Sequence, residues 1–485
     1  DVSEEDANYF LGILKVLDEE SDGESKELLA TNVIEYTRGR EIVLASHQIA
    51  SKVIESLLEF CTDENLGEYQ NAFREDIRTL CANRFSSHVL ETLISVSASR
   101  ALTGCVETEP PEKKVKEETS TYHQEKNKSF VETCSKFMMN NMEEFVWDSY
   151  ANHVIRTCVK ALSGEFTGET PIPVEWLAIV QEYVSRLRDW PFFKDFPYQE
   201  LTSGLLQTLV TSLERIDKNS LKSIGGFFTE AQDEEGKLHK LFSTESSIRF
   251  LEVLIRSAGK KLFTKIFLRL FHGNFKELSL LKSANFCVQK ILENIKYKDE
   301  FNICFTELET DFGEILQNGH SGVILALCQA CKRLEMNQYQ FIRSLKRALN
   351  CSKEGNMVIC VLKLKPHEKV LEDNSTFVHI HGSLILQEML NFRKPIEIIQ
   401  SILAIAPDQL MNYLNTAKGS FIANAFCSSP HVGEKSRVAF VNHLKGFFID
   451  LAVNKFGSRA VECLFEASTG ELRGKIVAEL AEKIN

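Results

Sequence analysis

The stretch Ala50-Ser51-Lys52-Val53-Ile54-Glu55 decides the fold, because variants of it return along the whole chain. It consists of a small residue, two variable residues, two apolar residues and a polar or variable residue. The clearest further copies are Ser86-Ser87-His88-Val89-Leu90-Glu91, Ala151-Asn152-His153-Val154-Ile155-Arg156 and Gly457-Ser458-Arg459-Ala460-Val461-Glu462. More apolar residues follow each copy at helical spacing, which indicates a repeated helical unit.

Eleven copies can be aligned on the first variable position. They begin at Ser51, Ser87, Asn152, Ser203, Ile248, Asn285, Ser321, Asn356, Ser383, Ser420 and Ser458. Most intervals are close to the 36 residues between Ser51 and Ser87, which is the size of one helical hairpin repeat. We therefore expect an all-α fold, in which residues 1–485 form a single solenoid of about eleven repeats.

The longer intervals contain insertions. The clearest insertion, at 107–128, is polar and has almost no large apolar residues, so we expect a disordered surface loop there. Smaller breaks surround Pro171 and Pro173 and follow Trp190-Pro191, which predicts irregular repeats in this part of the chain.

Composition and charge limit the classes of function. The chain has 485 residues, 44% of them hydrophobic, and a net charge of -12, which counts against a general nucleic-acid binder but permits a local basic face. No apolar run approaches the length of a membrane span and no signal peptide is evident, so we expect a soluble intracellular protein. Because the chain begins without Met, we expect it to be a fragment that lacks basic tails.

Cysteine usage and motifs predict no catalytic or metal chemistry. Thirteen scattered cysteines are typical of reduced core residues. Cys328-Gln329-Ala330-Cys331 lies in an apolar helical stretch without a second pair at zinc-site spacing, so we interpret it as core. We expect no metal, no cofactor and no enzymatic activity.

The repeated phrase resembles the Pumilio (PUF) repeat, whose second main helix carries two residues that read a base edge and one that stacks on a base. The resemblance spans almost the whole chain. The eleven copies, the insertion after the second copy and segments such as Gly319-His320-Ser321-Gly322 are similar to the divergent nucleolar Pumilio-like proteins of small-subunit ribosome biogenesis. This resemblance implies a C- or U-shaped superhelix that binds single-stranded RNA.

Helical geometry explains the spacing of these positions. The first variable residue and the residue four places later project on nearly one line. The second variable residue, one place after the first, lies about 100° round the helix and projects between neighbouring repeats. We call them the first reader, the second reader and the stacking residue. A Glu second reader accepts from the N-H groups of guanine, which predicts guanine for Ser51 with Glu55, Ser87 with Glu91, and Ser458 with Glu462.

The resemblance supplies the other pairings. It implies uracil for Asn285 with Gln289, adenine for Ser383 with Gln387, and cytosine for Asn152 with Arg156. Glu252, Ser420 and Asn424 occupy further reading positions without an assigned base. Family members bind RNA antiparallel, so the predicted site is 5'-GxAxxUxxCGG-3'.

Stacking contributes about 1–3 kcal/mol per base on an aromatic or guanidinium plane. The stacking candidates are Lys52, His88, His153, Arg249, Phe286, Phe421 and Arg459. Gly204 and Gly322 cannot stack, and Leu384 and Met357 are poor substitutes, which weakens base recognition in those repeats.

Plainer interpretations stand beside this one. A lone Glu or His on a helix is more often a surface residue, and Phe286 and Phe421 could fill the core like most of the 33 Phe. An armadillo or HEAT scaffold that binds proteins would share the helical repeats. A dual role, with RNA on one face and small-subunit assembly factors on the other, is compatible with the RNA-binding interpretation.

The resemblance also implies the biological setting. The expected ligand is pre-ribosomal RNA near the 3' end of the small-subunit RNA, which the protein would cover until an endonuclease is allowed to cut. The expected location is the nucleus and nucleolus. We expect a monomer, with assembly factors, including that endonuclease, as further partners.

Overall fold

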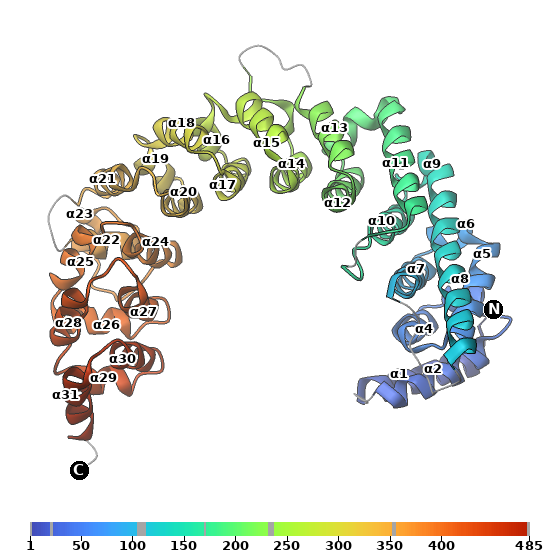
Figure 1. The fold of residues 1–485 in the computed structure, drawn as a ribbon, viewed down its shortest axis with the longest axis horizontal. Helices are drawn as coiled ribbons and strands as arrows, with labels where there is room; N and C mark the ends of the chain where they lie inside the picture. Colours follow the sequence, from blue (N-terminus) through green and yellow to red (C-terminus); the bar gives the residue numbers. More distant parts are fainter. Residues whose placement is uncertain are drawn as a thin grey trace. The chain divides into compact units, whose positions relative to one another are not determined.

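A computed structural model describes residues 2–19, 23–103, 113–168, 171–230, 237–351 and 356–482. These residues form helices and connecting turns, and none of them lies in a strand. The contacts divide the chain into two compact units, Asp1–Phe263 and Thr264–Asn485. The expected all-α repeat fold is thus confirmed (Figure 1).

The first unit contains α1 to α14 and most of α15. Their bounds are α1 Glu4–Glu19, α2 Gly23–Thr37, α3 Glu41–Ala45, α4 Ala50–Leu57, η1 Leu58–Phe60, α5 Asp63–Glu75, α6 Ile77–Ala82, α7 Ser86–Thr103, α8 Lys113–Asn140, α9 Met142–Phe145, α10 Ala151–Leu162, α11 Val174–Asp189, η2 Pro191–Tyr198, α12 Glu200–Ile216, α13 Lys218–Thr229, η3 Lys240–Phe242, α14 Glu245–Ser257 and α15 Lys260–Ile266.

The second unit begins within α15. Its further elements are η4 Phe267–Phe271, α16 Phe275–Leu280, α17 Asn285–Asn294, α18 Lys298–Leu308, α19 Phe312–Gln317, α20 Ser321–Leu334, α21 Gln338–Ala348, α22 Met357–Lys363, α23 His367–Leu371, α24 Ile380–Leu390, α25 Ile396–Leu403, α26 Pro407–Leu414, α27 Ser420–Ser428, α28 Glu434–His443, α29 Phe448–Ala452, α30 Gly457–Glu466 and α31 Gly470–Ala481.

The helices that carry the repeated phrase pack side by side in each unit. In the first unit each of α4, α7, α10, α12 and α14 contacts the next, and in the second unit α17, α20, α24, α27 and α30 do the same. We call the five helices of each unit its inner row. The apolar pair of the phrase in each of these ten helices, such as Val53 and Ile54, is buried against the neighbouring helices. This burial turns the variable positions of the phrase to one common face in each unit.

The structure corrects the interpretation of the copy that begins at Asn356. Every residue of α22, Met357–Lys363, is buried, and α20 contacts α24 directly. In Figure 1 α22 lies beside α24, and it also packs on α25. The apolar character of Met357 and Cys360 takes this helix into the core, so it is not part of the inner row.

The expected loop at 107–128 is also corrected in part. Residues 107–112 lie outside the described residues, but residues 113–128 belong to α8. Polar contacts hold this helix: Gln70 Nε2 donates to Asn127 Oδ1 at 2.6 Å and to Ser97 Oγ at 2.9 Å, with Asn127 only 3% exposed. Hydropathy does not reveal such a polar docking contact.

The remaining breaks and the cysteine pair lie as expected. Pro173 precedes α11, and Pro191 begins the 3-10 segment η2. Cys328 and Cys331 are buried in α20, where burial raises the pKa of both thiols. Among the described residues, no group of three His, Cys, Asp or Glu could hold a metal ion, and no helix is long and apolar enough to span a membrane.

Candidate nucleic-acid interface

The stacking position faces solvent in seven of the inner-row helices. Lys52, His88, His153, Arg249, Phe286, Phe421 and Arg459 are all exposed. Phe286 is 52% exposed and Phe421 is 46% exposed, whereas Phe250, next to Arg249, is completely buried. These two phenyl rings therefore do not fill the core. Each unit presents planar or cationic groups on helices that pack against each other, which is an arrangement on which bases can stack.

The first reader is buried in most repeats, which helix geometry alone did not predict. Ser51, Ser87, Asn152, Asn285, Ser383 and Ser420 are at most 3% exposed, and Ser458 alone of the predicted first readers is exposed. Several of these side chains bind the backbone. The Ser383 hydroxyl donates to Lys418 O at 2.7 Å, and Asn152 Nδ2 donates to Val146 O at 2.8 Å.

The second reader is partly accessible, and in α17 and α24 the first reader holds it through a hydrogen bond. Glu55, Glu91, Arg156, Glu252, Gln289 and Gln387 are half-buried, and Asn424 and Glu462 are exposed. Gln289 Nε2 donates to Asn285 Oδ1 at 3.0 Å, and Gln387 Nε2 donates to Ser383 Oγ at 3.0 Å. Each bond fixes the orientation of the amide, so the buried first reader acts by orienting its neighbour four residues later.

Ser203 and Gln207 of α12 form the same pair, which the sequence analysis did not assign. Gln207 Nε2 donates to Ser203 Oγ at 3.1 Å, and the Ser203 hydroxyl donates to Ser246 O at 2.7 Å in the first turn of α14. The signal for this pair was its likeness to Ser383 with Gln387. The glycine at the stacking position, Gly204, obscured it.

Glycine at the stacking position has a structural reason. A Cβ atom on Gly204 would lie 2.4 Å from Arg156 Nη2, and one on Gly322 would lie 2.7 Å from Gln289 Nε2. In both cases the second reader of the preceding inner-row helix occupies the space where a side chain would be. In these two places the second reader therefore covers the stacking position of the next inner-row helix.

Arg156 is the most constrained of the second readers. Its Nε donates to Asn152 Oδ1 at 2.8 Å and its Nη2 donates to Leu201 O at 2.7 Å. Desolvation lowers the pKa of this guanidinium, although Glu91 and Glu200 oppose the shift. Part of its donor capacity is thus committed within the protein, and the remainder is available to a base.

Glu91 is held from the following repeat. Thr157 Oγ1 donates to Glu91 Oε2 at 2.7 Å, and His88 Nδ1 lies 3.6 Å from Glu91 Oε1. Thr157 lies one residue after the second reader of its own copy, and the sequence analysis did not single it out. It fixes the carboxylate that is predicted to read guanine.

His153 presents an uncharged plane. Desolvation, followed by the nearby positive charge of Arg156, lowers the pKa of its imidazole. The ring is therefore neutral at neutral pH and can stack without the cost of removing a charge from water.

A further copy of the phrase occurs in α1. Ala7-Asn8-Tyr9-Phe10-Leu11-Gly12 has the small, variable, variable, apolar, apolar, variable order, and α1 contacts α4. Asn8 is exposed, but the Tyr9 ring is stacked on Tyr36 with centroids 3.9 Å apart. The phrase itself could have identified this helix, whose aromatic stacking residue is already covered by Tyr36.

Comparison with known proteins agrees with this geometry. The chain is 24% identical over 538 residues to Nucleolar protein 9 of Homo sapiens, covering 99% of this chain and 84% of that protein. It is 23% identical over 536 residues to Pumilio homolog 23 of Arabidopsis thaliana, covering 99% and 69%.

Solved structures show the same fold. A structure of APUM23 with GGAAUUGACGG has a TM-score of 0.79 at 21% identity, covering 99% of this chain and 93% of that chain. Related APUM23 structures contain GGAUUUGACGG and GGAGUUGACGG.

A family model described as the NOP9-like PUF repeat domain matches residues 39–171 and 201–485. Because this match covers most of its length, the chain belongs to the NOP9-like PUF repeat family.

Proposed function

We propose that this chain is a sequence-selective single-stranded RNA-binding protein that acts on pre-ribosomal RNA in the nucleolus. The observation that carries the proposal is the exposure of Lys52, His88, His153, Arg249, Phe286, Phe421 and Arg459 at one register position of the inner row. Relatives that match almost the whole chain are named Nucleolar protein 9, and this chain is likewise nuclear and nucleolar.

The RNA of the APUM23 structures supports the predicted letters. The sequence predicts 5'-GxAxxUxxCGG-3', and each of its six specified letters coincides with 5'-GGAAUUGACGG-3'. In antiparallel binding α4, α7, α10, α12 and α14 face letters eleven to seven. The helices α17, α20, α24, α27 and α30 then face letters six, five, three, two and one.

Letter four would face the repeat whose helix, α22, lies outside the inner row. Because α20 contacts α24 directly, no second reader is available between letters three and five. The RNAs of the APUM23 structures carry A, U or G at this letter and agree elsewhere. We expect this chain to tolerate any base at letter four.

We also propose bases for two letters that the sequence analysis left open. Ser203 with Gln207 repeats the hydrogen-bonded geometry of Ser383 with Gln387, which favours adenine at letter eight. Glu252 is a half-buried carboxylate at the second reading position of α14, which favours guanine at letter seven. Both assignments coincide with the APUM23 RNA.

The finer biological role follows from the family resemblance. Bound near the 3' end of the small-subunit RNA as a monomer, the protein sterically prevents early endonucleolytic cleavage. Small-subunit assembly factors, including the endonuclease, are its further partners. Catalysis by this chain is not required for that role.

Binding of the whole chain to fluorescent 5'-GGAAUUGACGG-3', measured by polarisation, tests the proposal. Changing the last two letters to CC, or combining Glu55→Ala with Glu91→Ala, should each weaken binding by about 1–3 kcal/mol per lost contact without unfolding the protein. Equal binding of all RNAs, or binding of none, would instead support a protein-binding scaffold.

A further inference from the structure

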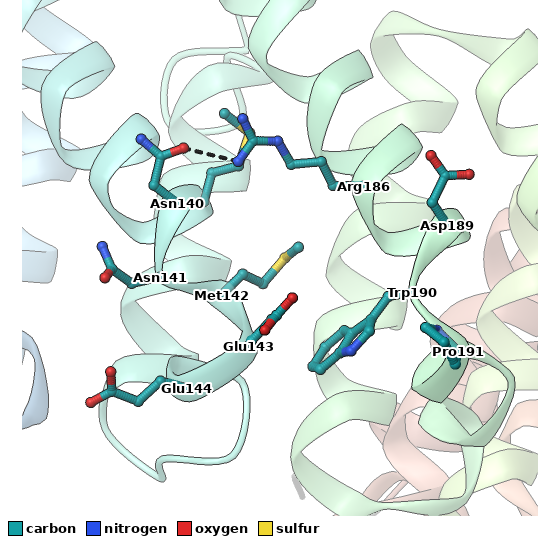
Figure 2. Close-up of a pocket in the computed structure, with 10 residues that line it drawn as sticks. Asn140, Asn141, Met142, Glu143, Glu144, Arg186, Asp189, Trp190 and Pro191 are labelled. Carbon is teal, nitrogen blue, oxygen red and sulfur yellow. Dashed lines mark hydrogen bonds between the residues drawn. The ribbon is translucent and has the colours of Figure 1, made fainter.

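A cavity of about 610 Å³ lies in the first unit, away from the inner row. Its walls come from the end of α8 with α9 and from the end of α11 with η2 (Figure 2). Its lining includes Asn140, Met142, Glu143, Arg186, Asp189 and Trp190. No residue of α10 or α12 lines it, so the RNA-reading positions leave this cavity unexplained.

Aromatic rings extend from this cavity onto the surface. Trp190 packs edge-to-face on Trp147 at 6.1 Å and on Phe192 at 5.8 Å between ring centroids. Trp147 is 46% exposed and Phe192 is 56% exposed. Trp147 and Phe192 thus extend the aromatic surface of the half-buried Trp190 beyond the cavity, and exposed aromatic side chains beside a cavity are typical of a binding site.

The charge of the cavity is negative. Glu143, Glu144 and Asp189 line it, against the single cation Arg186. Arg186 is engaged, since it donates to Asn140 Oδ1 at 2.9 Å and pairs with Glu182, and Glu144 pairs with Arg78 at 2.6 Å. Within the described part of the chain, Glu143 and Asp189 have no ion-pair partner. This charge disfavours a phosphate backbone and suits a cation.

Figure 2 shows the Glu143 carboxylate turned toward the Trp190 indole. A guanidinium or ammonium group between them would meet a carboxylate on one side and an aromatic face on the other. Its aliphatic stem would lie along Met142, which also lines the cavity. We infer that this cavity, the Trp190 pocket, binds an Arg- or Lys-containing basic segment of a partner protein.

A fluorescein-labelled nine-residue peptide of alternating Gly and Arg is the probe, with Gly-Lys and Gly-Glu peptides beside it. Polarisation with the whole chain should show binding of the two basic peptides and none of the acidic peptide. Glu143→Gln should weaken binding by about threefold or more, as expected for one partly exposed ion pair beside an aromatic ring. Trp190→Leu should weaken it by about tenfold or more, as expected for a central aromatic anchor.

Glu214→Gln is the matched control, because Glu214 is an exposed carboxylate of the same unit outside the pocket. It removes the same charge and should leave peptide affinity unchanged. Glu143→Gln should also leave affinity for 5'-GGAAUUGACGG-3' and the melting temperature unchanged, so this variant decides the matter even if Trp190→Leu does not fold. Equal effects of Glu143→Gln and Glu214→Gln would refute the pocket, as would loss of RNA binding in Glu143→Gln.

Discussion

Gly204→Ala tests whether the glycine at the stacking position serves to admit the preceding second reader. The added Cβ would lie 2.4 to 2.6 Å from three atoms of the Arg156 guanidinium. The guanidinium must then move, because a Cβ atom does not stay that close to non-bonded nitrogen or carbon atoms. We expect it to lose the 2.7 Å hydrogen bond to Leu201 O.

Two opposing effects determine how much Gly204→Ala changes the free energy of unfolding. A hydrogen bond from a charged group contributes about 1.5–3 kcal/mol. Replacing Gly by Ala inside a helix stabilises by about 0.8–1.0 kcal/mol. Gly204→Ala should therefore lower the free energy of unfolding by about 0.5–2 kcal/mol. When Arg156→Ala is already present, the same change should stabilise the protein by about 1 kcal/mol.

A double-mutant cycle measures the difference. Urea unfolding followed by circular dichroism is performed on the wild type, the two single variants and the double variant. The sign of the Gly204→Ala effect should reverse between the two backgrounds. The same destabilisation with and without Arg156 would show that Gly204 is needed for another reason.

Three further predictions concern other contacts. Thr157→Val removes the hydroxyl that donates to Glu91, so the preference for G over A at letter ten should fall several-fold in polarisation assays while circular dichroism stays unchanged. Arg100→Gln should lower the free energy of unfolding in urea by about 3–5 kcal/mol, because this buried guanidinium binds Asp63 and two backbone carbonyls. Arg38→Gln, which removes the exposed ion pair with Glu68, should lower it by less than about 1 kcal/mol. Equal losses in the two variants would contradict this argument. Hydrogen bonds from Lys365 and then Ser375 hold the pKa of the Asp373 carboxyl below its usual range, so its contribution to stability is present above the unfolded pKa of about 3.9 and is lost as pH falls through the folded pKa. The difference in melting temperature between wild type and Asp373→Asn should accordingly disappear in acid, and a difference that persists there would contradict this assignment.

The periodic features of the fold could be predicted from the sequence. The phrase at Ser86–Glu91 and its copies places an apolar pair on one helical face, and packing of that pair exposes the stacking residue. The prediction for Phe286 and Phe421 depended on this register, because composition alone would put both rings in the core. Exposure of these two side chains is what the repeat pattern predicts.

The sequence predictions that the structure corrected were wrong for physical reasons. The copy at Asn356 fits the phrase, but Met357 and Cys360 at its stacking and reading positions are apolar, and burial of the whole of α22 follows from that. Residues 113–128 are polar, yet they form the first part of α8, and Gln70 donates a hydrogen bond to the buried Asn127 in that part. Burial of first readers such as Ser383 could not be foreseen, because a serine fits both a surface and a tight backbone contact.

A specificity switch tests the central claim most directly. Glu91→Gln converts the α7 pair, Ser87 with Glu91, to the combination that Ser383 and Gln387 form in α24. Binding is measured for 5'-GGAAUUGACGG-3' and for the same RNA with A at letter ten. The variant should prefer A where the wild type prefers G, each by about 1–3 kcal/mol. If Glu91→Gln weakens binding of both RNAs equally, the inner row does not read bases in the register proposed.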